Sequence, residues 1–137
     1  MERILQKIGR IDEYVRIIGT LKHECHERFA ADPIYRGAML HYLYLMADTC
    51  IVLAEMVIKK NGLRPPQFYS EAFDILGDSG ILEPEFAFSF AKIAGFRNFL
   101  AHDYDHIEAS IICGNVLDSL SDVKAYIRQI SANLGLE

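Results

Sequence analysis

The sequence predicts an all-α protein, an antiparallel four-helix bundle with one additional short helix. Apolar residues recur three and four positions apart along most of the chain, which is the period of an amphipathic helix. No stretch alternates apolar and polar residues as a half-buried strand does. Short connections between the segments favour antiparallel packing of neighbouring helices. With 137 residues, of which 51% are hydrophobic, the chain is expected to form one domain over residues 1–137.

The first two helices are expected before residue 61. The first is expected to run to about Phe29. Its apolar stripe begins at Ile4 and includes Phe29 at its end. Asp32 and Pro33 mark the start of the second, because aspartate caps a helix N-terminus and proline fits its first position. Apolar residues on several faces predict that this second helix is the most buried one. It is expected to end at residues 59–62, where two lysines precede an Asn-Gly pair.

A short helix and two long ones are expected in the rest of the chain. The prolines at positions 65 and 66 keep the connection after the second helix non-helical. The short helix is expected to begin with Ser70 near its cap and to stop around residues 77–80. A long helix opens at Pro84 and runs through Leu100. The last helix is expected from about residue 106 to residue 133.

Charge and cysteine content limit the classes of function. The net charge is −5, so any contact with RNA must come from a local patch or from a partner. Cys25, Cys50 and Cys113 are odd in number and far apart, which predicts free, mostly buried thiols in a reducing cytoplasm. The N-terminus has no signal-peptide pattern, and the most apolar run, residues 49–58, is too short to cross a membrane. The sequence therefore predicts a cytoplasmic protein without a membrane segment.

The helix that opens at Pro84 breaks its own pattern near its end. Arg97 stands on the core-facing stripe, where a charge is costly unless it is paired or used. Gly95, just before it, costs a helix about 1 kcal/mol relative to alanine. His102 follows five residues later, about 140° away on an ideal helix, so Arg97 and His102 would not share a face. Asn98 and His102 would.

Such breaks concentrate at functional sites. A purely structural interpretation stays open beside the functional one. In it, Arg97 pairs with a carboxylate inside the bundle and His102 caps the C-terminus of the helix, where a protonated imidazole is favoured.

Residues 95–104, GFRNFLAHDY, resemble the R-x-x-x-x-H-x-Y motif of the HepT-like toxins, a branch of the HEPN superfamily. Residues 63–76 and the order of the helices are also similar to this branch, and the resemblance covers essentially the whole chain. It implies a HEPN-like bundle that acts as an endoribonuclease without a metal or another cofactor. It also implies a homodimer, or a higher oligomer, that meets through the motif helices. The implied partner is an MntA-like nucleotidyltransferase antitoxin.

The resemblance assigns a role to each motif residue. Arg97 and His102 are the expected catalytic residues: arginine binds phosphate oxygens through two N–H groups, and histidine exchanges protons near neutral pH. Asn98 is expected to support them by orienting His102 or by donating to the phosphate. Tyr104 is the expected acceptor of AMP from the antitoxin, because nucleotide phosphates two residues from His102 would occupy the place of the substrate phosphate. A packing role for Tyr104 stays open.

Other polar residues are weaker candidates. Lys59, Lys60 and Arg64 form a small basic cluster that either contacts the RNA backbone or only complements a helix end. His23 and His26 are three residues apart on a helix, a spacing that can share a metal, but no third ligand is evident and a metal site is not expected.

Two rival functions stay open at this point. In one, the chain is a non-catalytic HEPN binding module that supports a partner nucleotidyltransferase. In the other, it is a structural bundle in which Arg97 is paired internally. His41, Tyr42 and Tyr44 are expected to be ordinary bundle residues.

Overall fold

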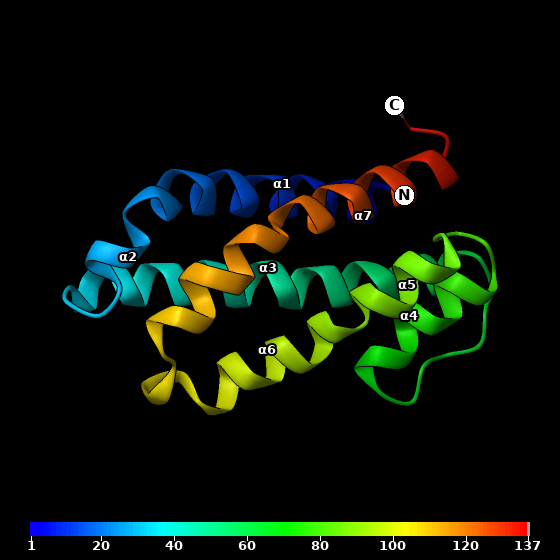
Figure 1. Ribbon diagram of the computed structural model, residues 1–137. Helices are drawn as coiled ribbons and strands as arrows, with labels where there is room; N and C mark the ends of the chain where they lie inside the picture. Colours follow the sequence, from blue (N-terminus) through cyan, green and yellow to red (C-terminus); the bar gives the residue numbers. More distant parts are fainter. Residues whose placement is uncertain (137) are drawn as a thin grey trace.

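The computed structural model describes residues 1–136, and no strand occurs in that part of the chain (Figure 1). The all-α prediction is therefore confirmed. The elements in chain order are α1 (Glu2–Leu21), η1 (Lys22–Glu24), α2 (Cys25–Arg28), α3 (Pro33–Lys60), α4 (Tyr69–Asp78), α5 (Pro84–Phe90), α6 (Lys92–His102), η2 (Tyr104–His106), η3 (Ile111–Val116), η4 (Leu117–Ser119) and α7 (Leu120–Asn133).

Helix α3 runs through the middle of the molecule, and the other long helices pack around it. Helices α1 and α7 lie side by side along one side of α3, and α6 lies along the opposite side (Figure 1). The short α4 and α5 cover one end of the bundle. Helix α3 runs antiparallel to both α1 and α6, as the short connections predicted.

The central position of α3 explains its composition. Its buried side chains lie on several faces of the helix and include Leu43, Cys50 and Val57. By length and composition alone, α3 is long and apolar enough to cross a membrane. The run at residues 49–58, on which the prediction from the sequence rested, is too short to do so. Half of its most apolar window is buried inside the fold, as expected for the core helix of a bundle.

The start of α3 follows the sequence signal. Asp32 accepts hydrogen bonds from the backbone N–H groups of Ile34 and Tyr35 at 3.0 and 3.2 Å, and Pro33 occupies the first turn. At the other end, Gly62 has a φ of +67°, a backbone conformation that favours glycine. Both predicted boundaries of this helix are confirmed.

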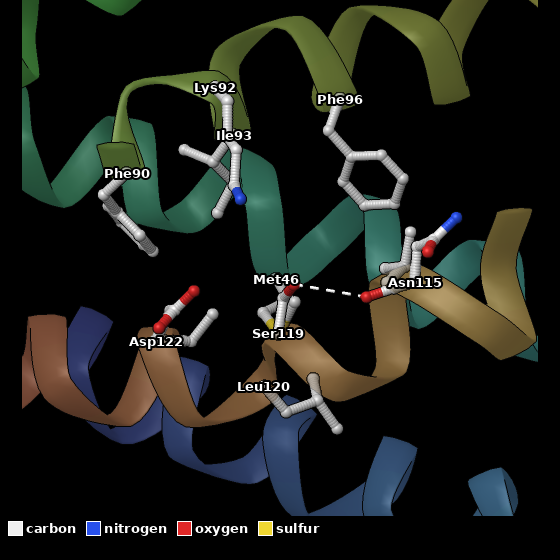
Figure 2. A pocket seen from close by; sticks show the side chains of 11 residues that line it. Met46, Phe90, Lys92, Ile93, Phe96, Asn115, Ser119, Leu120 and Asp122 are labelled. Atoms are coloured by element: carbon white, nitrogen blue, oxygen red, sulfur yellow. Dashed lines mark hydrogen bonds between the residues drawn. The ribbon is translucent and has the colours of Figure 1, made fainter. Parts of the chain in front are cut away.

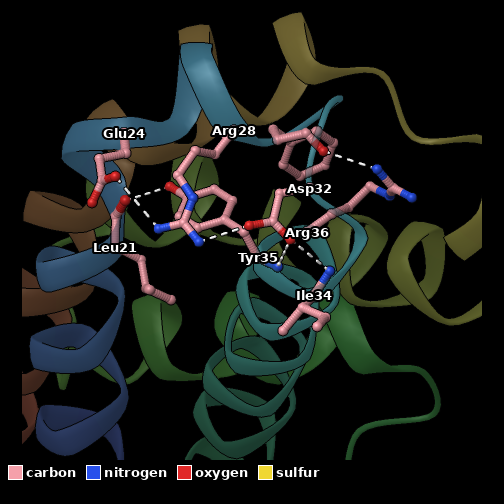
Figure 3. A network of polar contacts seen from close by, with 8 residues as sticks. Leu21, Glu24, Arg28, Asp32, Ile34, Tyr35 and Arg36 are labelled. Atoms are coloured by element: carbon pink, nitrogen blue, oxygen red, sulfur yellow. Dashed lines mark hydrogen bonds and ion pairs between the residues drawn. The ribbon is translucent and has the colours of Figure 1, made fainter.

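The corner between α2 and α3 is held by a polar network (Figure 3). Arg28 pairs with Asp32 at 2.7 Å and with Glu24 at 3.4 Å, and its guanidinium lies 4.8 Å from the ring centroid of Tyr35. The Tyr35 hydroxyl donates to the carbonyl of Leu21. The side-chain hydrogen bond from Arg28 holds the pKa of Asp32 below its ordinary value. The carboxylate that caps α3 is therefore kept charged.

The long helix expected from Pro84 through Leu100 is divided into α5 and α6 at Ala91. No proline or glycine marks this division in the sequence. An aromatic cluster accompanies it: Phe90 stacks on Phe86 and on Tyr126, at ring-centroid distances of 5.2 and 4.7 Å. Helix α5 packs on α4, whereas α6 packs mainly on α3. The division thus lets α6 follow the surface of α3 independently.

The predicted boundaries of two other helices are wrong in detail. Helix α4 begins at Tyr69, and Ser70 is not its cap; Glu71 instead accepts from the backbone N–H of Gln67 at 2.7 Å. The last helix was expected from about residue 106, but regular α-helix begins only at Leu120. Residues 111–119 form π- and 3-10 turns, and Gly114 and Asn115 within them have low helix propensity.

The prediction of three free cysteines is wrong for two of them. Cys25 and Cys113 form a disulfide across 88 residues, and both side chains are buried. The bond joins the start of α2 to the π-turn segment before α7. Spacing in the sequence could not show this contact, because only the packing of α2 against that segment brings the two thiols together. Cys50 is free and buried, as expected.

Candidate functional site

Arg97 lies on the face of α6 that packs against α3, and its side chain is only 20% exposed. Its Nε donates to Oδ1 of Asp48 on α3 at 3.1 Å, and its Nη1 donates to Oδ1 of Asn98 at 3.2 Å. A charged group on this stripe was expected to be paired or used, and one edge of the guanidinium is paired. The structural interpretation of an internally paired arginine is thus correct for that edge.

Two tyrosine rings complete the surroundings of Arg97. Its guanidinium carbon lies 5.2 Å from the ring centroid of Tyr44 on α3 and 5.3 Å from that of Tyr69 at the start of α4. Both distances are in the range of a cation–π contact. Burial lowers the pKa of Arg97, but the hydrogen bond and charge of Asp48 together with the electrostatic effect of Tyr44 and Tyr69 outweigh burial, and the pKa stays above its ordinary value. Helices α3, α4 and α6 therefore hold a permanently charged guanidinium in one place.

Asn98 is exposed and contacts Arg97 instead of orienting His102. Among residues 1–136 no side-chain hydrogen bond joins Asn98 to His102. His102 is the last residue of α6, where the helix dipole favours a cation, and it is exposed. The rotation between Arg97 and His102 has the expected consequence: Arg97 faces α3, and His102 is not part of that contact.

Tyr104 follows in the turn η2 and is 46% exposed. Its hydroxyl oxygen lies back against α3: a Cβ built at Gly37 would be 3.5 Å from it. This distance is an ordinary van der Waals contact, so the hydroxyl lies next to α3 without requiring glycine there. The same ring forms one wall of a hollow between α3 and the end of α6. The other residues that line it are Leu40, His41, Tyr44, Leu100 and Ala101.

Four residues at this site were not identified as functional from the sequence. Asp48 and Tyr69 contact Arg97, His41 lines the hollow, and Tyr44 does both. A signal for three of them existed. His41, Tyr44 and Asp48 are spaced three and four residues apart, which puts them on one face of a helix. Nothing in the sequence, however, indicates that this face meets α6.

The basic cluster is separated from the motif within one chain. Lys59 and Lys60 end α3 and are exposed, whereas the hydroxyl of Tyr104 lies at Gly37, 22 residues earlier. At about 1.5 Å per residue this is roughly 33 Å along the helix. Arg64 pairs with Glu71 at 3.3 Å. The three cations thus form no common surface with Tyr104 in a single chain.

A second hollow lies on another side of α6, where it faces α7 (Figure 2). Its lining is mainly apolar and includes Met46, Ile93, Phe96 and Leu120. The hollow contains none of the motif residues, so the candidate site is the α3–α6 face instead.

His23 and His26 are both exposed on η1 and α2. Within residues 1–136, no group of three histidine, cysteine, aspartate or glutamate side chains is arranged to hold a metal ion.

The chain is similar to several known proteins over most of its length. A family model described as "Ribonuclease HepT-like" matches residues 4–130. The mRNA nuclease HepT of Shewanella oneidensis is 23% identical over 129 residues, which are 94% of this chain and 96% of that protein. The tRNA nuclease HepT of Aphanizomenon flos-aquae is 33% identical over 94 residues, 67% of this chain and 63% of that protein.

A solved structure is also similar. It contains a tri-AMPylated HEPN toxin of Shewanella oneidensis in complex with an MNT antitoxin, and its toxin superposes with a TM-score of 0.84. The match covers 94% of this chain and 96% of that toxin at 23% identity. The HEPN-like bundle expected from the motif is thereby confirmed.

Proposed function

The chain belongs to the HepT-like ribonuclease family, and from that premise we propose that it is the endoribonuclease toxin of a toxin–antitoxin pair. An MntA-like nucleotidyltransferase antitoxin neutralises it by transferring AMP to Tyr104. The observation that supports this most is the fixed, charged Arg97, held by Asp48, followed after five residues by an exposed His102. The relatives named as an mRNA nuclease and a tRNA nuclease support RNA as the substrate class.

The proposed cleavage uses the RNA's own 2′-hydroxyl and no metal ion. The 2′-oxygen forms a bond to the adjacent phosphorus while the bond from phosphorus to the 5′-oxygen breaks. His102 exchanges the protons, taking one from the nucleophile or giving one to the leaving oxygen. Arg97 stabilises the negative charge that develops on the phosphate. The products are a 2′,3′-cyclic phosphate and a 5′-hydroxyl, and DNA, which lacks the 2′-hydroxyl, is not cut.

The proposed active unit is a homodimer, or a higher oligomer built from it, that meets through α6. Arg97 is held in its charged form by Asp48, so of the two expected catalytic residues only His102 can transfer a proton. The reaction needs both a base and an acid, and a two-fold axis beside α6 supplies His102 twice. Asn98, exposed beside Arg97, supports the phosphate from either subunit.

In the proposed neutralisation, the Tyr104 oxygen attacks the α-phosphorus of ATP. The new bond links tyrosine to AMP, and pyrophosphate leaves with the electron pair of the broken bond. The exposure of Tyr104 supports its accessibility, and a related toxin is known in a tri-AMPylated form with its antitoxin. The added phosphate competes with RNA beside His102. Lys59, Lys60 and Arg64 remain candidate RNA backbone contacts outside this centre.

One observation favours a rival. The carboxylate of Asp48 already occupies an edge of Arg97 and could keep RNA phosphate away from it. The chain would then be a non-catalytic HEPN module that supports its nucleotidyltransferase.

RNA cleavage by the purified protein in excess EDTA, beside His102→Ala, separates the two functions. Cutting that persists in EDTA, yields cyclic-phosphate ends and disappears in the variant is the expected result. Absence of cutting by protein whose intact mass shows no AMP on Tyr104 would favour the binding module.

The proposed location is the cytoplasm, where the RNA substrates are. A persistent disulfide is uncommon there, because cytoplasmic thiols are kept reduced. The state of Cys25 and Cys113 in protein alkylated before cell lysis tests this location. Free thiols at both positions would mean that the disulfide of the structure does not form in the cell, and recovery of the intact disulfide would argue against a reducing compartment.

A further inference from the structure

The hollow beside Tyr104 is continuous with the surroundings of Arg97 through one shared residue. Tyr44 lines the hollow and also places its ring 5.2 Å from the guanidinium carbon of Arg97. Going from Arg97 past Tyr44, the next side chains along this face are those of His41 and Tyr104. A fixed positive charge thus stands at one end of a short surface, and aromatic rings stand at the other.

The two helices that form this surface contribute to it at regular intervals. Helix α3 supplies His41, Tyr44 and Asp48, and α6 with its following turn supplies Arg97, Ala101 and Tyr104. The residues on α3 are spaced three and four apart and so lie on one helix face, and Arg97 and Ala101 are four apart on α6. Tyr104 follows in the turn η2. The buried Leu40 and Leu100 also line the hollow, and the small side chain of Ala101 leaves room between the rings. Tyr104 and His41 are exposed at its rim.

We propose that this hollow is a nucleobase subsite, formed by His41, Tyr44 and Tyr104, which receives the base of the nucleotide whose phosphate contacts Arg97. The inference rests on the proposed ribonuclease function and adds the way in which the substrate is held. Aromatic side chains bind bases by stacking, and this works for any base because each has a π-face. The subsite therefore takes single-stranded RNA, whose bases are free to leave the stack.

The charge distribution favours a base over a phosphate at this place. The chain carries a net charge of −5, and the exposed Asp103 and Asp105 flank Tyr104. These carboxylates repel a phosphate near the hollow but do not repel an uncharged base. Because the chain is acidic overall, contacts to RNA phosphates alone give weak binding. Stacking of a base in the hollow adds to the affinity for RNA. AMP attached to the Tyr104 oxygen would then place a nucleotide at the rim of the subsite as well as block the scissile phosphate.

The test uses the full-length protein, with Tyr104 shown by mass to be unmodified, and adenosine 3′-monophosphate as the probe. Two-dimensional NMR titration reports both the affinity and the residues that respond. The nucleotide is expected to shift the amides of residues 37–44 and 100–104. Ribose 5-phosphate and inorganic phosphate, which lack a base, are expected to shift only the neighbourhood of Arg97. Equal affinity and the same shifted residues for all three probes would overturn the subsite.

Paired variants separate stacking from general disturbance. His41→Ala and Tyr104→Leu are each expected to weaken nucleotide binding about tenfold. His41→Phe and Tyr104→Phe, which keep a ring, are expected to restore it. His26→Ala, an exposed histidine that does not line the hollow, is the matched control and is expected to bind as wild type. If His41→Phe and Tyr104→Phe weaken nucleotide binding as much as the variants without a ring, stacking is contradicted.

The failure of this inference is distinguishable from failure of the proposed function. If the protein cuts RNA in EDTA but prefers none of the three probes, the ribonuclease stands and the subsite is wrong. If it binds the nucleotide through the hollow but cuts no RNA, the subsite stands and the ribonuclease is wrong.

Discussion

The two ends of the motif on α6 are built differently. Arg97 is 20% exposed, hydrogen-bonded to Asp48 and placed near two tyrosine rings. His102, at the last residue of the same helix, is exposed, and no side-chain hydrogen bond reaches it within residues 1–136. The proposed phosphate-binding group is thus pre-organised inside a single chain, whereas the proposed proton-transferring group is not.

This difference indicates which part of the proposed RNA cleavage requires a second subunit or bound RNA. A pre-organised charge stabilises a developing negative charge without reorganisation during the reaction. Proton transfer requires a base within hydrogen-bond reach of its substrate, and such contacts often tighten only in the complex. His102 therefore depends on RNA, on a second subunit or on both to be placed.

The largest expected effect concerns the segment that follows His102. The disulfide between Cys25 and Cys113 closes 88 residues and ties residues 111–116 to α2. Reduction is expected to destabilise the fold by about 4–5 kcal/mol, because the unfolded chain regains its loop entropy. Thermal unfolding with and without dithiothreitol measures this, and hydrogen exchange should increase first in residues 103–119. The double variant Cys25→Ala/Cys113→Ala is the control. If dithiothreitol also lowers its melting temperature, the loss of stability does not come from reduction of this disulfide.

The next effect is on Arg97 itself. Asp48→Ala removes the acceptor that fixes Nε, and the misplaced guanidinium is expected to lower the RNA cleavage rate about 100-fold. Because the pair is partly exposed, stability should change by only about 1 kcal/mol or less. Cleavage kinetics beside thermal unfolding measure both quantities.

Asp48→Asn keeps an oxygen acceptor of the same shape and is the matched control. It is expected to retain most of kcat. A gain of activity in Asp48→Ala would instead mean that the carboxylate competes with the RNA phosphate, as the non-catalytic rival implies.

A smaller effect is expected where Tyr104 touches α3. A Cβ at Gly37 would lie 3.5 Å from the Tyr104 hydroxyl, an ordinary contact, so Gly37→Ala should be tolerated and should stabilise α3 by up to about 1 kcal/mol. Gly37→Leu should displace the hydroxyl toward solvent. AMP transfer by the cognate nucleotidyltransferase is then expected to rise about fivefold, equivalent to about 1 kcal/mol. AMP transfer is followed with radiolabelled ATP. Equal transfer to Gly37→Ala and Gly37→Leu would show that the contact with α3 does not restrain the Tyr104 hydroxyl.

The smallest effect concerns a second ion pair, Arg28–Asp32, at the corner between α2 and α3. Asp32 pairs with Arg28, and its pKa is below the ordinary value because of that hydrogen bond and two backbone N–H groups. Its contribution to stability is therefore present above the unfolded-state pKa and is lost as pH falls through the lower folded-state pKa. Unfolding free energy measured across pH 2–5 should decrease on acidification, and Asp32→Asn, which keeps the cap, should flatten that decrease. If Asp32→Asn leaves the pH dependence of the unfolding free energy unchanged, other carboxylates cause the decrease.

The sequence predicted more of the fold than of the site. Asp32 with Pro33 and the glycine at 62 are local signals, and they located both ends of α3 because capping depends on neighbouring residues. The division at Ala91 was missed, since it has no proline or glycine and accompanies the packing of Phe90 between two other rings. The late start of α7 was missed for a similar reason: that segment is tied by a disulfide to a distant helix.

For the site, the motif in the sequence was enough to identify the family and the order of the motif residues. An arginine on an apolar stripe, a histidine five residues later and a tyrosine two further on are visible without coordinates. Only the tertiary structure decided what surrounds Arg97, since Asp48 is 49 residues away and Tyr69 is 28 away. Helical periodicity determines which residues share a face, but which faces meet depends on the packing of the whole chain.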